Sequence, residues 1–309
     1  MGVQLLHYRP WRGEFHGPGW SVWALARVSL GLVARRKVFW VLYALALFFF
    51  LMFFFGQYLL SWVESQALEQ DVRILGARTD PQWLIRQLRN GLKINGTGDT
   101  YRIFFAYQAS IVMAVLALAG SILVGNDFRF GSLPFYLSKP LGRWHYLIGK
   151  CLAVGVFVNL MTTVPALVLF VQYGLLTTWD YFIDQAALVL GIIGYGLLLT
   201  VCLSLLLVTM ASWLRRTVPL IMAWTTLFVF LRLLARALVE GLHYDPRWRL
   251  IDLWNSTNLV GSYFLGVPST RVWPQPQPEV HEAALMLVGV CLFCIMYLHR
   301  QIRAVEVVQ

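Results

Sequence analysis

The sequence predicts an all-α membrane protein with six transmembrane helices and an amphipathic N-terminal helix at the membrane interface. Hydrophobic residues make up 59% of the 309 positions and charged residues only 13%, whereas about a quarter of a typical soluble domain is charged. Six apolar runs are long enough to cross the hydrocarbon core, which takes about 20 residues. Most basic residues lie beside these runs, where anionic lipid headgroups attract them.

Residues 1–37 are predicted to form a cytoplasmic tail followed by an interfacial helix. Over 20–37, apolar residues recur at three- and four-residue steps, which is typical of a helix with one apolar face. Basic residues in the same segment can bind lipid headgroups, so the helix is expected to lie in the interface plane. Two interpretations stay open, a simple surface anchor and a cuff that also contacts a cytoplasmic partner. The residues assigned to the interface are Trp20, Arg27, Arg35 and Arg36.

The transmembrane domain is predicted over 38–300, followed by a cytoplasmic tail at 301–309. The third span contains Pro165, and the hydroxyls of Thr162 and Thr163 can satisfy the backbone groups that the proline frees. We therefore expect a kink there rather than a break. The six spans are predicted at about 38–60, 103–125, 151–176, 185–214, 217–239 and 283–298.

Small residues inside the spans predict close helix contacts. Gly191, Gly194 and Gly196 lie together in the fourth span, where they would let a neighbouring helix approach. Cys291 and Cys294 form a C-x-x-C motif in the sixth span. Because no βαβ pattern surrounds the motif, we interpret the two cysteines as small residues at a helix contact rather than as a redox pair.

The charge distribution predicts that both ends of the chain lie in the cytoplasm. In that orientation basic residues far outnumber acids in the inner segments, whereas acids outnumber basic residues in the outer loops. Arg35, Arg36 and Lys37 adjoin the first span, where the positive-inside rule has most effect. The outer loops at about 61–102 and 240–282 are long, and the second ends in an irregular, proline-rich stretch.

The sequence offers no pattern for catalysis, metal binding or ATP binding. Gly149 and Lys150 are followed by Cys151 rather than by Ser or Thr, so no phosphate-binding loop is formed. The six histidines fall in tails, loops and span ends instead of clustering as metal ligands would. The positive charge does not form a basic stripe with aromatics, so nucleic acid is not an expected partner.

Energy for transport is therefore expected to come from a separate protein. The first four spans and the sixth contain no ionisable residue at mid-depth, whereas a proton-driven carrier usually has buried carboxylates or histidines there. An ion channel or secondary carrier is one alternative function, and a membrane-embedded lipid-modifying enzyme is another. The enzyme would need Asp, His and Ser residues converging at one membrane face, a set that the sequence lacks.

The loop between the second and third spans resembles that of the ABC-2 type transporter permeases. In that family the loop reads acid, three residues, Gly-Ser/Thr-Leu, then Leu-Ser-x-Pro-apolar-x-Arg and a closing Gly-Lys. This chain departs from the pattern in having Asp where the family often has Glu, and Pro134 adds a helix stop. The matching residues are Asp127, Gly131, Ser132, Leu133, Leu137, Ser138, Pro140, Arg143 and Lys150.

The resemblance implies an exporter subunit of the bacterial inner (plasma) membrane that pairs with a second permease copy or a paralogue. It also implies a cytoplasmic ATP-binding subunit that holds ATP and Mg²⁺, so that this chain needs no cofactor and is not itself an enzyme. The loop would couple ATP hydrolysis to the helices, with Asp127 and Arg143 at the contact. The alternative is an ordinary loop whose charges obey the positive-inside rule. The coupling residues implied are Asp127, Gly131, Ser138, Pro140, Arg143 and Lys150.

Arg232 and Arg236 interrupt the second half of the fifth span, and Glu240 follows at the same four-residue spacing. In one interpretation the arginines reach the outer headgroups and Arg236 pairs with Glu240. In the other they line the translocation path and select an anionic or lipid-headgroup substrate.

Overall fold

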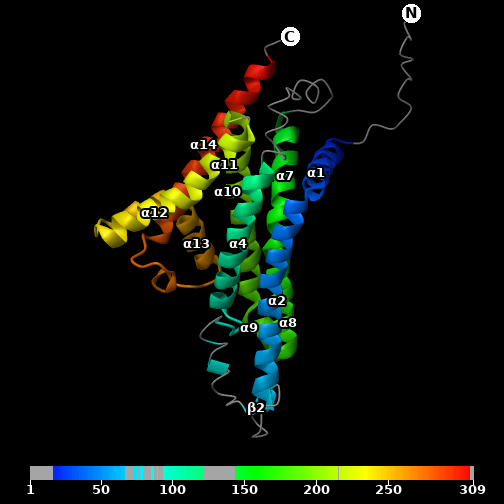
Figure 1. Ribbon diagram of the computed structural model, residues 1–309, viewed down its shortest axis with the longest axis vertical. Helices are drawn as coiled ribbons and strands as arrows, with labels where there is room; N and C mark the ends of the chain where they lie inside the picture. Colours follow the sequence, from blue (N-terminus) through cyan, green and yellow to red (C-terminus); the bar gives the residue numbers. More distant parts are fainter. Residues whose placement is uncertain are drawn as a thin grey trace, which may run out of the picture.

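The computed structural model describes residues 17–66, 73–74, 77–78, 85–86, 89, 93–120, 143–214 and 216–306. Among these residues, six helices are long and apolar enough to cross a membrane. The predicted all-α membrane fold is therefore confirmed, and Figure 1 shows its long helices gathered into one bundle. Many large apolar side chains are exposed on its surface, which suits a lipid environment. The spans are Lys37–Ser65, Gly98–Leu118, Trp144–Leu176, Ala186–Leu214, Thr217–Gly241 and Val280–Gln301.

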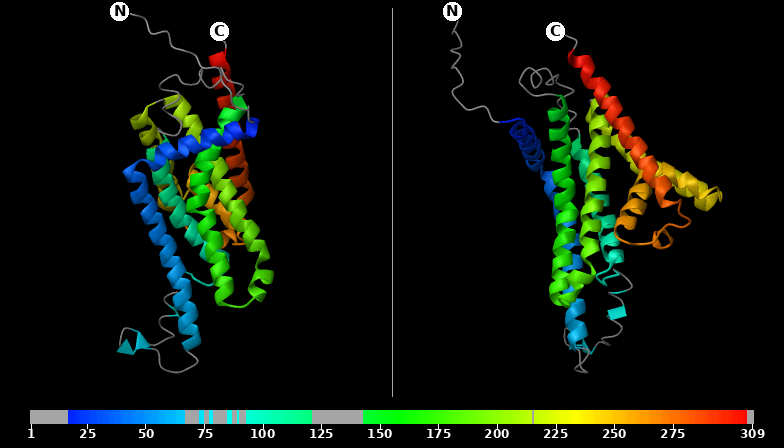
Figure 2. Two further views of the ribbon diagram at one scale, coloured as in Figure 1. Left: turned by 90° about the vertical axis from the view of Figure 1, so that its right-hand side faces the viewer. Right: turned by 180° about the vertical axis from the view of Figure 1, so that it is seen from behind.

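The N-terminal helix, α1 (Pro18–Ala34), lies across one end of the bundle and is followed by α2 (Lys37–Gln66), which runs along it (Figure 2). Pro18 opens the helix, where its missing N–H costs no hydrogen bond. Ala26, Ser29 and Val33 form its buried stripe. The stripe recurs at three and four residues, so the predicted amphipathic helix is confirmed.

The centre of the bundle is built from the second, third and fourth spans. These are α4 (Gly98–Gly120), α7 (Arg143–Met161) with α8 (Thr163–Leu176), and α10 (Ala186–Leu214). The ring of Tyr195 on α10 stacks on that of Phe105 on α4 with centroids 4.4 Å apart. The first, fifth and sixth spans are buried along far less of their length, so they form the periphery.

The second span begins at Gly98 and not near residue 103 as predicted. Asp99 and Arg102 lie in its first turns and are both buried, because they form an ion pair that lowers the cost of removing their charges from water. Hydropathy alone assigns a segment with two charged residues to a loop, so the predicted start of the span was too late. The predicted end of this span, at 125, lies outside the described residues.

The predicted kink in the third span is confirmed. The α-helical pattern is interrupted at Thr162, between α7 and α8. The predicted role of the two hydroxyls is wrong, because neither bonds to the Met161 carbonyl that Pro165 leaves without its helical donor. The Thr162 hydroxyl donates to the Val158 carbonyl at 2.7 Å, and the Thr163 hydroxyl donates to Asn159 Oδ1 at 2.7 Å. A short helix, α9 (Asp180–Asp184), then leads to α10.

The fifth span is not a uniform α-helix. It consists of α11 (Thr217–Thr225), the π-helical segment η3 (Thr226–Phe230), α12 (Leu231–Arg236) and a second π-helical segment, η4 (Ala237–Gly241). In Figure 1, α12 projects away from the bundle. The last span, α14 (Val280–Glu306), is also tilted and diverges from α12.

The segment between the fifth and sixth spans contains a buried helix that the sequence did not predict. The 3₁₀ helix η5 (Pro246–Ile251) leads into α13 (Leu253–Phe264), and a second 3₁₀ turn, η6 (Ser269–Arg271), precedes α14. Every residue of α13 from Leu253 to Ser262 is buried, because the helix packs against α10, α14 and α4. Between the first and second spans, β1 (Arg73–Ile74) pairs antiparallel with β2 (Ala77–Arg78).

Candidate functional site

Four of the predicted coupling residues lie outside the described part of the chain. Asp127, Gly131, Ser138 and Pro140 all fall within 121–142, so their predicted roles stay predictions. Arg143 is the first residue of α7, and only its backbone is described. The structure therefore places the helix that follows the predicted coupling loop, but not the loop.

Lys150, the last predicted coupling residue, is buried in the joint between α7 and α1. Its side chain is 4% exposed, and its Nζ donates to Ser29 Oγ at 3.1 Å. The ammonium also lies 5.8 Å from the centre of the Tyr146 ring. At Gly149 the two helices are so close that a Cβ would lie 2.7 Å from Leu25 Cδ2. Lys150 thus fastens α1 to the first turns of α7 and does not lie on a free surface.

The four residues assigned to the interface lie on the exposed side of α1 or just beyond its end. Trp20 and Arg27 belong to the helix, and Arg35 and Arg36 follow it. Trp20, Arg27 and Arg35 line one hollow of about 610 Å³ together with Trp23. Basic and aromatic side chains on one exposed face suit a lipid headgroup region.

The charge ladder predicted for the fifth span is interrupted. Arg232 is half-buried and Arg236 is exposed, but Glu240 lies within η4, where the α-helical spacing is lost. Among the described residues, Glu240 Oε1 accepts from Arg249 Nη2 at 2.9 Å, and no ion pair joins it to Arg236. The predicted Arg236–Glu240 pair is therefore wrong, because the π-helical turn moves Glu240 off the face that Arg236 occupies.

The positive charges of Arg232 and Arg236 act on the carboxyl group of Asp252. It caps the N-terminus of α13 by accepting from the Asn255 N–H at 3.1 Å. Burial raises the pKa of the Asp252 carboxyl, and the Asn255 N–H and the charges of Arg232 and Arg236 partly offset that rise. Both arginines thus belong to the electrostatic surroundings of α13, which the sequence pattern could not show.

Two further polar contacts hold the segments around α13. Arg249 is only 2% exposed and donates to the Gln275 carbonyl at 3.1 Å in addition to Glu240. Asn255 and Gln277 exchange two amide hydrogen bonds, at 2.8 and 2.9 Å. Buried polar groups are costly without hydrogen-bond partners, so these bonds stabilise the segment that connects the fifth span to the sixth.

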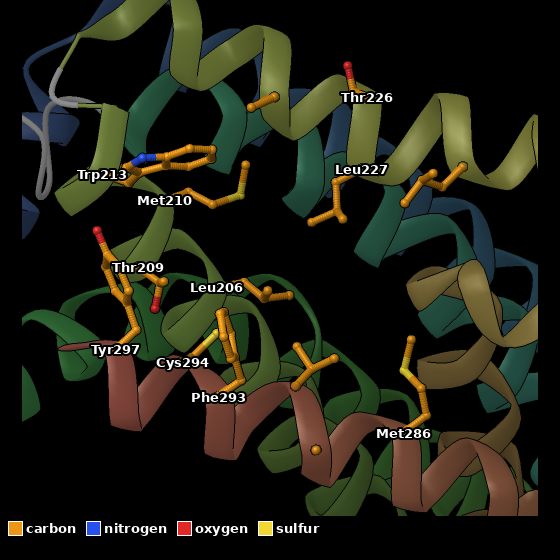
Figure 3. Close-up of a pocket in the computed structure, with 14 residues that line it drawn as sticks. Leu206, Thr209, Met210, Trp213, Thr226, Leu227, Met286, Phe293, Cys294 and Tyr297 are labelled. Carbon is orange, nitrogen blue, oxygen red and sulfur yellow. The ribbon is translucent and has the colours of Figure 1, made fainter. Parts of the chain in front are cut away.

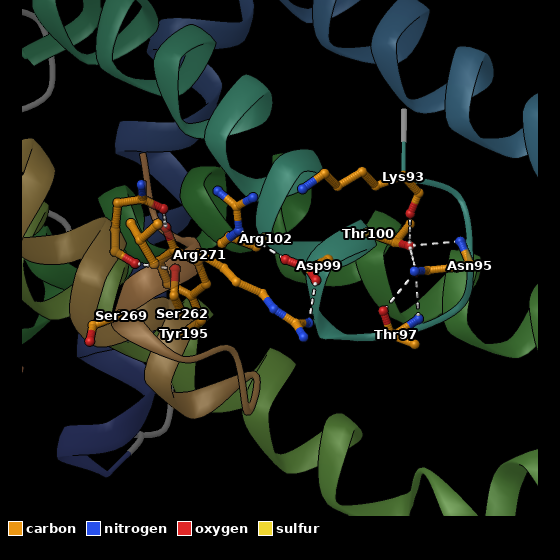
Figure 4. Close-up of polar contacts among 12 residues, drawn as sticks. Lys93, Asn95, Thr97, Asp99, Thr100, Arg102, Tyr195, Ser262, Ser269 and Arg271 are labelled. Carbon is orange, nitrogen blue, oxygen red and sulfur yellow. Dashed lines mark hydrogen bonds and ion pairs between the residues drawn. The ribbon is translucent and has the colours of Figure 1, made fainter. Parts of the chain in front are cut away.

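A third contact ties this region to the start of α4, as Figure 4 shows. Asp99 lies 3.6 Å from Arg102 Nε on its own helix and 3.3 Å from Arg271 Nη1 on η6. At Gly98 a Cβ would overlap the backbone carbonyl of Leu265. The sequence gives no sign of the Asp99–Arg271 pair, whose members are 172 residues apart.

An apolar groove of about 970 Å³ opens between α10, the fifth span and α14 (Figure 3). Trp213, Leu227, Met286 and Phe293 project into it from these three elements. The few polar groups in its wall include the Thr209 hydroxyl. Its size is in the range of pockets that hold organic ligands, and its walls are membrane-spanning helices.

The thiols lie where the C-x-x-C interpretation places them, at a helix contact. Cys202 Sγ on α10 and Cys291 Sγ on α14 are 3.8 Å apart, and all four cysteines are reduced. Within the described ranges, no group of three or more His, Cys, Asp or Glu side chains is arranged to hold a metal ion.

The molecule thus presents three features for a functional argument: the α1–α7 joint, the polar surroundings of α13 and the apolar groove. No family model matches the chain, and no curated protein matches it.

Proposed function

We propose that this chain is the membrane-spanning subunit of an ATP-driven exporter of the ABC-2 type, energised by a separate cytoplasmic ATP-hydrolysing subunit. Two observations support the proposal. The first is the loop motif from Asp127 to Arg143. The second, on which the proposal mainly rests, is the joint between α1 and α7. Lys150 and Gly149 lock α1 onto the first turns of the helix that directly follows the loop. A force applied to the loop would move α1 and α7 together, as a coupling element requires.

The charge at this end of the bundle supports a cytoplasmic location for it. Arg27, Arg35, Arg36, Arg216 and Arg300 all lie on elements that begin or end there (Figure 1). Cytoplasmic ends of spans are enriched in Lys and Arg. In this orientation both termini and the loop at 121–142 face the cytoplasm, where ATP is available.

The spans give little support to a carrier that moves protons. Among the described residues, Asp99 and Arg102 lie in the first turns of α4 and Lys150 lies two turns into α7. These groups are near membrane boundaries, whereas a proton relay needs carboxylates or histidines at mid-depth. Arg232 and Arg236 lie deeper in the fifth span, but a guanidinium stays protonated and cannot relay protons. Energy from a partner fits this distribution better.

A second copy or a paralogue is proposed as the other membrane partner. The first span exposes many large apolar side chains, including Phe48, Phe55 and Val41. Such surfaces suit either lipid or another apolar helix. Pairing would supply a substrate path that one six-helix bundle, with its filled centre, does not contain.

Co-purification tests the proposal. The tagged full-length chain, extracted from its native membrane in mild detergent, is expected to carry a soluble subunit that hydrolyses ATP with Mg²⁺. Arg143→Glu is expected to lower the co-purified ATPase activity on the order of tenfold or more, because losing one partner of a hydrogen-bonded charge pair costs about 2–5 kcal/mol. Asp127→Arg should act in the same direction.

Asp180→Arg is the matched control, since Asp180 lies on α9 at the opposite end of the bundle. It should leave the co-purified activity unchanged. If the chain purifies without any ATPase and conducts ions or moves solutes alone in liposomes, the proposal is wrong and a channel or carrier replaces it.

A further inference from the structure

One end of the apolar groove is bordered by aromatic and basic residues. Trp213 and Tyr297 line the groove near the ends of the fourth and sixth spans (Figure 3). Arg216 follows Trp213 by three residues and Arg300 follows Tyr297 by three, and both arginines are exposed. Along the groove, apolar residues are followed by aromatic and then by basic residues. This order matches that of the bilayer, from acyl chains to headgroups.

We propose that the groove is a binding site for one anionic phospholipid. Its acyl chains lie between α10, the fifth span and α14, and its phosphate faces Arg216 and Arg300. Met210 and Met286 in the wall suit flexible chains, because the unbranched thioether side chain adapts to irregular shapes. The proposal is independent of the transport function and holds for any role of the chain.

A second copy of the chain fits the groove less well. Symmetric pairing about an axis normal to the membrane brings the same residues of both copies to the same depth. The Arg216 and Arg300 side chains of the two copies would then lie at one level, and like charges across an interface are unfavourable. A phosphate at that level has the complementary charge.

Gly289 provides a way to fill the groove without disturbing the fold. It lines the groove on α14, and a Cβ built on it meets no atom within 4 Å. Replacing a helical glycine also removes an unfavourable helix residue. Gly289→Phe should therefore fold and occupy the space that we assign to the acyl chains.

The test uses the full-length chain reconstituted in bilayers of equal phosphatidylglycerol and phosphatidylcholine, re-extracted and analysed by native mass spectrometry. Wild type is expected to retain one phosphatidylglycerol per chain. Gly289→Phe should reduce retention at least tenfold, whereas Leu292→Phe should not. Leu292 is on the same helix, is 60% exposed and does not line the groove.

The headgroup is tested by Arg216→Gln combined with Arg300→Gln. The preference for phosphatidylglycerol over phosphatidylcholine should fall on the order of tenfold, given about 1 kcal/mol per basic residue near an anionic surface. Arg89→Gln, at an exposed arginine paired with Glu64 near the opposite end of the bundle, should not change it. Unchanged retention in Gly289→Phe, or equal retention of both lipids by wild type, overturns the proposal. If Gly289→Phe instead separates a dimer while lipid retention persists, the groove is an interface between copies.

Discussion

Lys150 shows how a single charged side chain is accommodated in an apolar setting. Its ammonium is enclosed between two helices, where Ser29 supplies a hydroxyl and Tyr146 an aromatic ring. The stem of the side chain packs among apolar groups while its end keeps polar contacts. The residue therefore acts through the contact between α1 and α7.

Ser29→Ala is expected to weaken this contact. The substitution removes an acceptor from a buried ammonium, and a hydrogen bond to a charged group contributes about 1.5–3 kcal/mol. The free energy of unfolding, measured by titrating mixed micelles with a denaturing detergent, should fall by about that amount. Ser110→Ala is the control, because the Ser110 hydroxyl is exposed and bonds only within its own helix, to the Ala106 carbonyl. Equal losses in both variants would contradict the assignment.

Asp252 is expected to make stability depend on pH. Burial raises the pKa of its carboxyl above the ordinary 3.8, so the folded chain binds the proton more readily than the unfolded chain does. The stabilisation that follows is complete below about pH 4 and is lost as pH rises through the folded pKa. Asp252→Asn keeps a helix-capping side chain but cannot ionise. The unfolding temperature of Asp252→Asn, measured relative to that of wild type, should therefore rise between pH 4 and pH 7. A difference in unfolding temperature that stays constant with pH would argue against a buried carboxyl.

At the scale of elements, neighbouring helices approach α10 closely at two of its glycines. A Cβ at Gly191 would overlap the Phe264 carbonyl oxygen at the end of α13, and one at Gly196 would overlap the Thr163 hydroxyl of α8. At Gly194 the nearest neighbour is a Phe264 ring carbon at an ordinary 3.5 Å. Two of the three glycines are thus needed for packing, and Gly194 is not.

Gly191→Ala and Gly194→Ala form a matched pair that tests this distinction. Gly191→Ala should lower the free energy of unfolding by about 1–3 kcal/mol, because overpacking against backbone cannot relax easily. Gly194→Ala should be neutral or raise it by up to about 1 kcal/mol, since alanine favours the helix. Thermal unfolding in one detergent compares them directly. Similar destabilisation by both would show that α13 does not lie against Gly191.

Hydropathy identified the six spans because a run of about 20 apolar residues seldom occurs outside a transmembrane helix. It could not find α13, which is 12 residues long and carries Asn255, Ser256, Thr257 and Asn258. Those side chains are buried only because α4, α10 and α14 surround them, which is a tertiary effect. Two local signals were available, the Asp252 cap and Gly266 at φ +71° just after the helix. For the candidate site, the aromatic and basic ends of the groove are visible in the sequence, but their convergence is not.

At the scale of the whole molecule, the two ends of the bundle differ in character. One end holds α1, the start of α7 and the end of α14, together with exposed arginines (Figure 2). The other end holds the hydrogen bond from the Tyr181 hydroxyl on α9 to the Gly96 carbonyl, at 2.6 Å. Burial raises the pKa of Tyr181 to about 12, so this phenol stays protonated and keeps donating. One end of the bundle is thus polar and the other basic, an asymmetry that suits a single orientation in the membrane.

Cysteine labelling tests that orientation. In a chain whose four native cysteines are replaced by alanine, Gly17→Cys and Trp179→Cys place one exposed thiol at each end of the bundle. In intact cells a membrane-impermeant maleimide should label Trp179→Cys, and it should label Gly17→Cys only after permeabilisation. The opposite pattern would invert the topology and exclude a cytoplasmic coupling loop.

The π-helical segments of the fifth span affect how relatives of this chain should be compared with it. A π-helical turn accommodates one residue more than an α-helical turn, and each residue of an α-helix advances about 100° around the axis. A homologue that lacks one residue within Thr226–Phe230 could therefore form an ordinary α-helical turn there and still present Arg232 toward nearly the same neighbour. A one-residue gap at this position leaves the azimuth of the following residues almost unchanged, so arginines aligned beyond the gap occupy equivalent places in space.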